Sequence, residues 1–382
     1  MKHQNLSVIV ATDSFKESLS AKEVTSLISD ILKKNLPQTT VYQIPMADGG
    51  EGTLEAIEQH GHYQIIELQV NNPVFQPIDT YYFIKEKTAY IELAKASGLE
   101  LLKKENRNPL YTTTYGTGEQ IFDAIKRNCS KIVLFLGGSA TNDAGIGILQ
   151  ALGFRLLNAD NKELSPTGNS LVDIKKIIST ETTKILQNIS FELVCDVNNP
   201  FYGRNGAAYI FAAQKGATES EIEFLDLGMK NFANLIYNNY NIDLQTTKHS
   251  GAAGGAAGGC MALLNCKIMS GAKFILQETG FSSIIPNANI VISGEGKIDN
   301  QTFNGKLLSE IIFQCKTFHK QFWCICGFSK LKNNELKSLG INKLYTLAKN
   351  ESEINFAIEN VRTLLQKETE NIVADIKEIF NF

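Results

Sequence analysis

A glycine-rich polar stretch at residues 137–147, GGSATNDAGIG, carries side chains that could bind an anion. An apolar run at residues 131–136 precedes it and an apolar-periodic segment follows it, so we expect a strand, a loop and a helix. Glycine permits positive φ and close approach of the backbone to a ligand, and the amino end of a helix presents N–H groups to phosphate or carboxylate. An ordinary turn would show the same pattern. The candidate binding residues are Gly137, Gly138, Ser139, Thr141 and Asp143.

The loop after the first predicted strand holds a lysine among hydroxyl groups. Residues 6–12 are apolar and β-branched, which is typical of a strand buried on both faces. A capping box of Ser20 and Glu23 then begins a predicted helix at residues 21–35. The loop therefore lies at the carboxyl end of the strand, which is the edge of an α/β sheet where ligands bind. Its candidate binding residues are Asp13, Ser14, Lys16 and Ser18.

Two more loops combine glycine with polar side chains ahead of a helix. ADGGEGT follows a predicted strand at residues 41–46, and NPLYTTTYGTGE precedes a predicted helix at residues 120–127. Consecutive threonine hydroxyls can bind an anion together with the first amides of a helix, or they can simply cap it. Asp-Gly-Gly is likewise ordinary turn chemistry. The candidates in these loops are Asp48, Gly49, Gly50, Thr113, Thr114, Gly116 and Thr117.

Cationic side chains and glycines recur in the second half of the chain. Lys215 lies in the loop QKGAT, and Arg204, one of five arginines, lies in a glycine-flanked loop where it could hold a carboxylate. The stretch SGAAGGAAGG at residues 250–259 is either a small-residue helix packed in the core or, at its start, a further phosphate cradle. Gly254 and Gly255 are the candidates in that stretch.

Carboxylates in two further loops suit metal or proton chemistry. Asp196 follows a predicted strand at residues 191–195, beside two asparagines. Such an oxygen-rich group suits Mg²⁺ or acceptance of a proton from a hydroxyl, although a lone aspartate after a strand is often only a turn cap. The loop at residues 293–306, SGEGKIDNQTFNGK, carries Glu295 and Asp299 among more charge than a connection needs.

The order of the predicted elements indicates an α/β fold with an inserted domain. Strands alternate with helices at both ends of the chain, and two strands in the middle have antiparallel hairpin spacing. The strands expected to form one parallel sheet lie at residues 6–12, 41–46, 63–70, 284–292, 322–326 and 343–348. We therefore expect a six-stranded parallel Rossmann-like sheet domain built from residues 1–73 and 284–382, and a second, inserted α/β domain with a mixed sheet at residues 74–283.

The composition describes a soluble globular protein with room for two domains. The chain has 382 residues, of which 43 % are hydrophobic and 20 % charged, and a net charge of −3. An acidic balance argues against nucleic acid or an anionic membrane as the main partner. The sequence shows neither a signal peptide nor a run of about 20 apolar residues, and its seven scattered cysteines are typical of reduced thiols. These features predict a cytoplasmic protein.

Common catalytic signatures are absent. Gly305 and Lys306 are followed by leucine rather than serine or threonine, so they do not form a Walker A loop, and no G-x-G-x-x-G follows a predicted strand. Protein-kinase and zinc-protease patterns are also missing, and the five histidines accompany no nucleophile elbow. A serine hydrolase is therefore disfavoured.

Eight motifs in one order closely resemble the bacterial glycerate kinase family of the first type. They are ATDSFKESLSA, ADGGEGT, TTYGTGE, GGSATNDAG, CDVNNP, QKGA, GAAGG and GEGKIDNQT, and the resemblance runs from Val8 to the terminal helix. The sequence departs from the family pattern at Ala144, where glycine is expected, and at Ala213 and Leu307, where proline is expected. These positions tune the backbone, so they bear on loop geometry more than on chemistry.

The resemblance implies a two-domain enzyme that transfers the γ-phosphoryl group of ATP to D-glycerate, most often at the 2-hydroxyl, in organic acid catabolism. ATP and Mg²⁺ are the implied cofactors, and a homodimer is left open. By this hypothesis Lys16 and Ser14 bind an anionic group, and Asp196 accepts the hydroxyl proton or steadies Mg²⁺. Glu295 and Asp299 serve the metal, and the threonine and GGSAT loops cradle phosphates.

Two alternatives remain open at this stage. One is a kinase for a related hydroxy acid or sugar acid. The other is a protein that senses glycerate or nucleotide without turnover, which is disfavoured because acidic residues recur beside the glycine loops and an anion receptor gains nothing from them.

Overall fold

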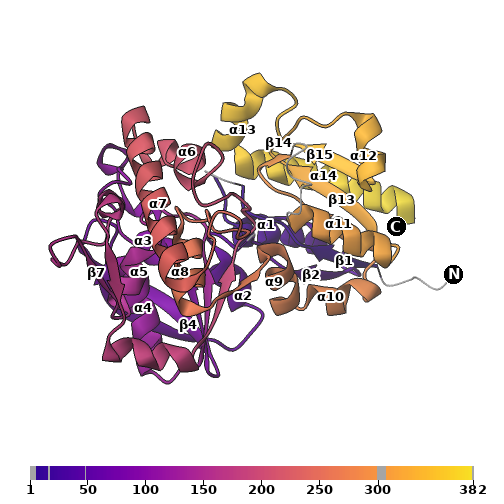
Figure 1. Ribbon diagram of the computed structural model, residues 1–382. Helices are drawn as coiled ribbons and strands as arrows, with labels where there is room; N and C mark the ends of the chain where they lie inside the picture. The colour runs from indigo at the N-terminus through magenta and orange to yellow at the C-terminus, as the bar shows by residue number, and fades with distance from the viewer. Residues whose placement is uncertain (1–5, 16–17, 48, 299–306, 381–382) are drawn as a thin grey trace. The chain divides into compact units, whose positions relative to one another are not determined.

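The computed structural model describes residues 6–15, 18–47, 49–298 and 307–380 (Figure 1). The contacts within the chain divide it into two compact units. Unit 1 comprises Met1–Asp48, Glu55–Gly61 and Gly271–Phe382, and unit 2 comprises Gly49–Leu54 and His62–Ser270. Three of the expected site residues, Lys16, Asp48 and Asp299, lie outside the described residues.

Unit 1 is built on a parallel sheet of five strands in the order β15-β13-β11-β1-β2. Strand β1 lies inside this sheet, with Val8 paired to Ile290 on one side and to Val41 on the other. Its apolar run predicted this position, because a strand buried on both faces has no polar side to alternate with. The strands are β1 (Ser7–Val10), β2 (Thr40–Gln43), β11 (Ile290–Ser293), β13 (Gln321–Cys326) and β15 (Lys343–Thr346).

Two long helices complete the core of unit 1. Helix α1 (Ala21–Asn35) begins at the capping box of Ser20 and Glu23, as the sequence predicts. It packs against α14 (Val361–Phe380), and both bury an apolar face in the same hydrophobic cluster. The remaining elements of the unit are α9 (Gly271–Glu278), α10 (Phe281–Ile284), η6 (Ile285–Asn287), β12 (Lys297–Ile298), α11 (Leu307–Thr317), β14 (Phe328–Ser329), α12 (Asn333–Leu339), η7 (Glu351–Glu353) and α13 (Ile354–Glu359).

Unit 2 is built on a mixed sheet of six strands in the order β10-β9-β6-β5-β4-β3. Four neighbouring strands run parallel, and β4 and β3 extend the sheet with antiparallel pairs. The parallel strands end at the same edge, where the polar loops follow them. The strands are β3 (Gln64–Asn71), β4 (Pro77–Lys85), β5 (Thr88–Glu92), β6 (Lys131–Phe135), β9 (Ser190–Val194) and β10 (Lys267–Met269).

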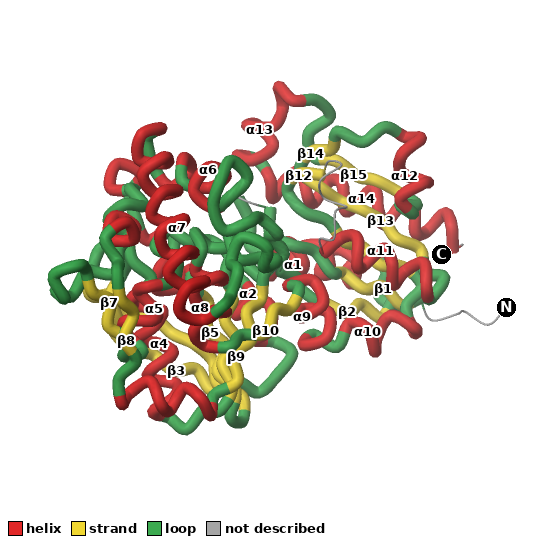
Figure 2. The backbone as a smooth tube through the Cα atoms, in the orientation of Figure 1, coloured by secondary structure: helices red, strands yellow, loops and turns green. Residues whose placement is uncertain are grey.

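Helices and long loops surround this mixed sheet, as the red and green segments of Figure 2 show. One continuous cluster of buried aliphatic and aromatic side chains joins the sheet to α4, α5, α7 and α8. Helix α2 (Thr53–Glu58) begins in unit 2. The remaining helices of the unit are α3 (Ala94–Ser97), η1 (Leu99–Leu101), η2 (Lys104–Asn106), α4 (Tyr115–Lys126), α5 (Ile146–Ala151), η3 (Gly168–Val172), η4 (Glu181–Asn188), α6 (Ala207–Phe211), η5 (Ala213–Lys215), α7 (Glu219–Tyr240) and α8 (Ala256–Leu264). Strands β7 (Arg155–Leu157) and β8 (Lys176–Ile178) form a separate two-stranded sheet.

The α/β fold with a parallel sheet and a mixed sheet is confirmed, but the six-stranded parallel sheet was wrong in one strand. The strand expected at residues 63–70 is β3, and it pairs antiparallel with β4 in unit 2. A connection of a few residues joins the two strands, whereas parallel pairing would need a crossover of a dozen residues or more. Unit 1 therefore keeps five strands.

The limits of the units differ from the expected ones at both ends of unit 2. Because β3 joins the mixed sheet, unit 2 resumes at His62 rather than after residue 73. It ends at Ser270 rather than at 283, and α9 of unit 1 follows directly. The strand expected from residue 284 begins only at Ile290, since residues 281–287 form α10 and η6. The apolar residues at that point belong to a helical turn, which short apolar runs do not distinguish from a strand.

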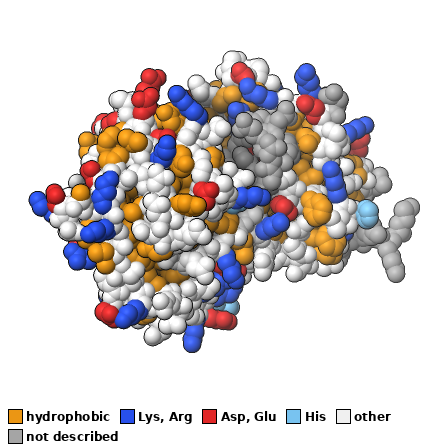
Figure 3. All heavy atoms as spheres, viewed as in Figure 1, with side chains coloured by type: hydrophobic (Ala, Val, Ile, Leu, Met, Phe, Trp, Pro, Cys, Tyr) orange, Lys and Arg blue, Asp and Glu red, His pale blue; other side chains and the backbone are white. Residues whose placement is uncertain are grey.

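The surface of the described residues mixes charges of both signs. On the face shown in Figure 3, Lys and Arg side chains stand among Asp, Glu and hydrophobic side chains. Within the described part of the chain, none of the helices has the length and apolar content needed to span a membrane.

The position of β3 can be tested at Gly116, in the first turn of α4. A Cβ atom at this residue would lie 1.8 Å from the carbonyl oxygen of Asn71 in β3. The Gly116→Ala substitution is therefore expected to lower the free energy of unfolding by about 3 kcal/mol, because backbone must move to admit the methyl group. Gly203→Ala is the matched control. Its Cβ would meet only Gln245, at 3.9 Å, so only its left-handed φ of 88° opposes alanine, which costs about 1 kcal/mol. Urea unfolding measures the free energy of unfolding of both variants. If Gly116→Ala and Gly203→Ala lower it equally, the packing of α4 on β3 is contradicted.

Candidate ligand-binding site

The carboxylate of Asp143 lies fully buried at the loop between β6 and α5. It accepts hydrogen bonds from the backbone N and the Oγ1 of Thr114, both at 2.8 Å, and from the backbone N of Gly145 at 3.1 Å and of Gly147 at 3.3 Å. Burial raises the pKa of Asp143, and these four hydrogen bonds act in the opposite direction. The carboxylate thus ties the loop before α4 to the loop before α5.

A buried lysine side chain from η5 packs against the loop between β6 and α5. Lys215, at the end of η5, is only 3 % exposed, and its Nζ donates to Ser139 Oγ at 2.8 Å and to the carbonyl oxygen of Thr141 at 2.7 Å. Burial lowers the pKa of Lys215 to about 7, while the negative charge of Asp143 favours its protonated form. The sequence predicts that Lys215 binds substrate or phosphate, and in the structure its ammonium group donates to the backbone of the GGSAT loop at Thr141.

The start of α8 packs directly on this loop through glycine. A Cβ atom at Gly254 would lie 2.0 Å from the carbonyl oxygen of Thr141, and one at Gly259 would lie 2.0 Å from that of Ala144. Ala144 donates its N–H to the carbonyl oxygen of Gly254 at 3.1 Å. Of the two readings of residues 250–259, the small-residue helix is confirmed for Ala256–Leu264, while Gly254 and Gly255 form a left-handed turn before it.

Ala144 occupies a left-handed backbone conformation, with φ of 54°. Alanine pays a steric cost there that glycine does not, which explains why glycine was the expected residue. Its methyl group is fully buried in the core of unit 2, and this packing offsets part of the cost.

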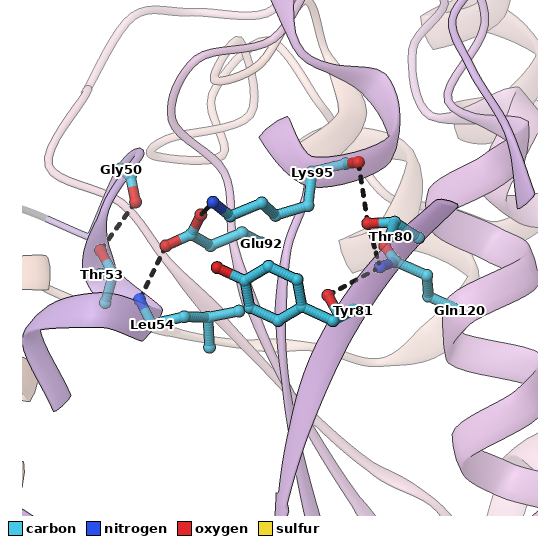
Figure 4. A network of polar contacts seen from close by, with 8 residues as sticks. All are labelled: Gly50, Thr53, Leu54, Thr80, Tyr81, Glu92, Lys95 and Gln120. Atoms are coloured by element: carbon cyan, nitrogen blue, oxygen red, sulfur yellow. Dashed lines mark hydrogen bonds and ion pairs between the residues drawn. The ribbon is translucent and has the colours of Figure 1, made fainter. Parts of the chain in front are cut away.

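The ADGGEGT loop also reaches this edge of the mixed sheet. A Cβ atom at Gly137 would lie 2.3 Å from Cα of Gly50, so the two loops touch backbone to backbone. Figure 4 shows how the second loop is held: Thr53 Oγ1 donates to the carbonyl oxygen of Gly50 at 2.7 Å, and Glu92 accepts from the N–H of Leu54 at 2.7 Å. Glu92 was missed by sequence analysis, although a glutamate that ends an apolar strand was a usable signal.

The threonine hydroxyls of the loop before α4 bond to protein groups. Besides Thr114, Thr112 Oγ1 donates to the carbonyl oxygen of Ala140 at 2.9 Å, and Thr117 Oγ1 lies 2.8 Å from Ser97 Oγ. Thr113 Oγ1 accepts from the N–H of Tyr115 at 3.1 Å, and Gly116 packs on β3. Sequence analysis left anion binding and helix capping open for these threonines. Thr114, the N-cap residue of α4, makes no side-chain capping hydrogen bond, and the hydroxyls of Thr112 and Thr114 join neighbouring loops.

Two neighbouring residues differ from these threonines. Thr141 Oγ1 and both polar atoms of the Asn142 amide are buried, and none of the three has a hydrogen-bond partner among the described residues. Buried polar groups in native proteins are usually paired, so an unpaired set at a glycine loop points to a ligand or to water. Asn142 was not among the candidates from sequence.

Asp196 and Arg204 lie further along the same unit. Asp196 is partly exposed and follows β9, at the same edge of the sheet. The segment after it is held to the turn before α8, because the N–H of Gly251 donates to the carbonyl oxygen of Asn199 at 3.1 Å. Arg204 is exposed, and its guanidinium group lies 4.8 Å from the centre of the Tyr209 ring.

In unit 1, two expected site residues follow adjacent strands. Asp13 comes after β1 and Glu295 after β11, and the N–H of Asp13 donates to the carbonyl oxygen of Gly294 at 2.9 Å. Asp13 Oδ1 accepts from the N–H of Ser14 at 2.6 Å, and Ser18 Oγ donates to the carbonyl oxygen of Phe15 at 2.8 Å. The carboxyl edge of this sheet therefore carries two carboxylates.

The described side chains do not by themselves make a complete metal site. Among residues 6–15, 18–47, 49–298 and 307–380, no group of three or more His, Cys, Asp or Glu side chains could hold a metal ion. Proteins often bind Mg²⁺ through only one or two carboxylates and complete its coordination with substrate phosphates and water. The oxygen ligands of Asp196 and Glu295 are of the type that this ion takes.

These features define an α/β protein with glycine loops, carboxylates and a buried lysine at the edges of its sheets, a class suited to anionic ligands. The model of the glycerate kinase family matches residues 8–377. The chain is 35 % identical over 374 residues to a glycerate kinase of Bacillus subtilis (strain 168), covering 97 % of this chain and 98 % of the relative. It is 34 % identical over 373 residues to a glycerate 2-kinase of Escherichia coli (strain K12), covering 97 % and 98 %.

A solved structure that carries the name glycerate kinase 2, from Salmonella typhimurium LT2, has the same fold. It superimposes with a TM-score of 0.83 at 32 % identity, over 99 % of this chain and 100 % of that one. The chain belongs to the glycerate kinase family.

The buried lysine predicts a pH-dependent stability. Because the pKa of Lys215 falls from 10.5 to about 7 on folding, the folded state binds fewer protons than the unfolded state between these values. The free energy of unfolding of the wild type, relative to that of Lys215→Met, should therefore rise as the pH increases from about 7 to 9.5, by up to about 1.4 kcal/mol per pH unit. Below pH 7 both states are protonated and the difference should be constant. Urea unfolding of both proteins measures it, and a difference that stays flat to pH 9.5 would contradict the burial of the ammonium group.

Proposed function

We propose that the protein catalyses ATP-dependent phosphorylation of D-glycerate to phosphoglycerate, with 2-phosphoglycerate as the product, in the catabolism of organic acids. The observation that carries this proposal is the family match over residues 8–377, which spans every motif loop of both units. Relatives that align over nearly their whole length are named glycerate kinase and glycerate 2-kinase, and the second name supports the 2-phospho product.

The arrangement of unit 2 suits this chemistry. Transfer of a phosphoryl group asks the protein mainly for positioning and for stabilisation of negative charge. The loop between β6 and α5, which contains GGSAT, is held by three contacts. Asp143 accepts from the N–H of Thr114, Lys215 donates to the carbonyl oxygen of Thr141, and Ala144 donates its N–H to the carbonyl oxygen of Gly254. The shape of this loop is therefore set before a ligand arrives, so little ordering remains to be done when phosphate groups bind along Gly137 and Gly138.

The unpaired polar atoms of Thr141 and Asn142 support recognition of the hydroxy acid. Phosphate oxygens only accept hydrogen bonds and would leave Asn142 Oδ1 without a donor. A hydroxyl group both donates and accepts, so it can pair with Oδ1 and with Nδ2 or the threonine hydroxyl. Exchanging the two ends of the amide does not change this argument, because both are unpaired.

The acid–base and metal roles rest on three carboxylates. Asp196 follows β9 and Glu295 follows β11, and Asp299 lies outside the described residues. Asp196 accepts the proton of the glycerate hydroxyl or steadies Mg²⁺, and Glu295 and Asp299 serve the metal. When bound, Mg²⁺ neutralises charge on the phosphates of ATP. Asp13, Ser14, Ser18 and Lys16, with Asp48, Gly49 and Arg204, bind substrate or phosphate groups.

We place the enzyme in the cytoplasm, where both small-molecule substrates are available. The net charge of −3 and the mixed surface charges support a protein that acts on small molecules rather than on nucleic acid. Self-association as a homodimer is compatible with this function and not required by it.

The function is tested by incubating the protein with ATP, Mg²⁺ and D-glycerate and identifying the product by phosphorus and carbon NMR. The wild type should form 2-phosphoglycerate, and Asp196→Asn should lower kcat by about 10²- to 10⁴-fold, because an amide cannot accept the hydroxyl proton. The matched control is Asp123→Asn on α4, where the carboxylate bonds Tyr82 and Arg127, and it should keep near-normal turnover. A near-normal kcat in Asp196→Asn would refute the proposed role of Asp196. If ATP is consumed only with another hydroxy acid, D-glycerate is not the substrate.

A further inference from the structure

Glu92 is a buried charged group at the edge of the mixed sheet that none of the roles above uses. It ends β5 and is 1 % exposed. A buried carboxylate is costly unless it is hydrogen-bonded or paired. Figure 4 shows two of its partners: Oε1 accepts from the N–H of Leu54 at 2.7 Å, and Oε2 lies 4.0 Å from Nζ of Lys95.

Through Leu54, Glu92 fixes the first turn of α2. The N–H groups of a first helical turn lack partners within the helix, and a carboxylate placed there is favourable. Thr53, one residue earlier, closes the preceding turn with a hydrogen bond from Oγ1 to the carbonyl oxygen of Gly50. Glu92 therefore sets the position of residues 50–54 against the end of β5.

Residues 50–54 in turn limit the position of the GGSAT loop. A Cβ atom at Gly137 would lie 2.3 Å from Cα and 3.3 Å from the carbonyl carbon of Gly50. A Cβ atom at Gly138 would lie 3.7 Å from Cβ of Glu51. A shift of the Gly50 backbone would therefore move the two glycines of the GGSAT loop or open a gap above them.

The segment that begins with Glu92 also holds this loop from its other side. Leu99 donates its N–H to the carbonyl oxygen of Gly138 at 2.8 Å, and Ala140 donates its N–H to that of Ser97 at 2.9 Å. Lys95, between Glu92 and Ser97 in the same segment, is anchored by its carbonyl oxygen, which accepts from Thr80 Oγ1 at 2.9 Å. The GGSAT loop is thus held between two segments that Glu92 joins.

We propose that Glu92 is a positioning residue for the bound nucleotide: by clamping residues 50–54 onto the segment 92–99, it sets the gap in which the phosphates of ATP meet Gly137 and Gly138. The described contacts of Glu92 include Leu54 and Lys95, and through them it acts on the loops as a positioning residue. The proposal rests on the proposed use of ATP by this chain.

The test compares Glu92→Gln and Glu92→Leu with the wild type, using the Kd for ATP from calorimetry and the kcat with glycerate. Glutamine keeps an acceptor for Leu54, whereas leucine removes it. We expect Glu92→Leu to weaken ATP binding about tenfold or more and Glu92→Gln to weaken it less, since a hydrogen bond to a charged group is lost in the first and weakened in the second.

The matched control is Glu192→Gln. Glu192 lies in β9 of the same sheet and pairs with Lys131 at 2.9 Å, away from the glycine loops. It should leave the Kd for ATP and kcat unchanged at a similar change in the thermal unfolding midpoint. Unchanged ATP binding in Glu92→Leu, or an equal loss in Glu192→Gln, would overturn the proposal.

A double-mutant cycle separates positioning from general loss of stability. Gly137→Ala disturbs the contact with Gly50 from the other side, so its effect and that of Glu92→Leu on the Kd for ATP should combine to less than the product of the two. Fully multiplicative effects would mean that the residues act independently, which overturns the proposal. A wild type that binds ATP and does not phosphorylate glycerate would refute the proposed function, and the Kd measurements would still decide the role of Glu92.

Discussion

The organisation of unit 2 depends on one buried carboxylate, that of Asp143. Its four hydrogen bonds reach two loops that are separated by some thirty residues of sequence, one before α4 and one before α5. One loop leads from β6 into α5, and the other leads from η2 into α4. The buried ammonium group of Lys215 contacts the loop before α5 at Ser139. Its positive charge offsets part of the cost of burying the carboxylate of Asp143.

Glycine complements this pair of charges. At Gly137, Gly254 and Gly259 another backbone comes so close that no side chain would fit, and the loops therefore stack with main chain against main chain. Gly138 in this loop is exposed, whereas Gly254 and Gly259 are buried. We propose that this stacking supplies a preformed frame for phosphate groups in the glycerate kinase reaction, because phosphoryl transfer depends mainly on positioning.

Much of this could be predicted from the sequence, because apolar runs and capping boxes are local signals. Helix α1 begins at the predicted capping box, and the strands β1, β6, β9 and β13 lie where the apolar runs place them. The place of β3 could not be read from its composition, since only pairing with β4 puts it in the mixed sheet. The roles of side chains were harder to predict. A lysine that holds a loop, as Lys215 does, has the same sequence pattern as a lysine that binds phosphate. Likewise, the sequence does not distinguish Thr114, whose hydroxyl is hydrogen-bonded, from Thr141, whose buried hydroxyl has no hydrogen-bond partner among the described residues. Lys16, Asp48 and Asp299 remain predictions.

Hydrogen exchange measures whether Asp143 holds the loop before α4, the loop before α5 and the start of α8 as one assembly. In Asp143→Asn the side-chain nitrogen cannot accept hydrogen bonds, so part of the network that joins the loops is lost. Mass spectrometry of the exchanging Asp143→Asn protein should show reduced amide protection together at residues 112–118, 143–148 and 251–259. The last of these has no direct bond to the carboxylate in the structure and is linked through Ala144 and Gly254. Loss of protection confined to residues 143–148, with the other two segments unchanged, would contradict this role of Asp143.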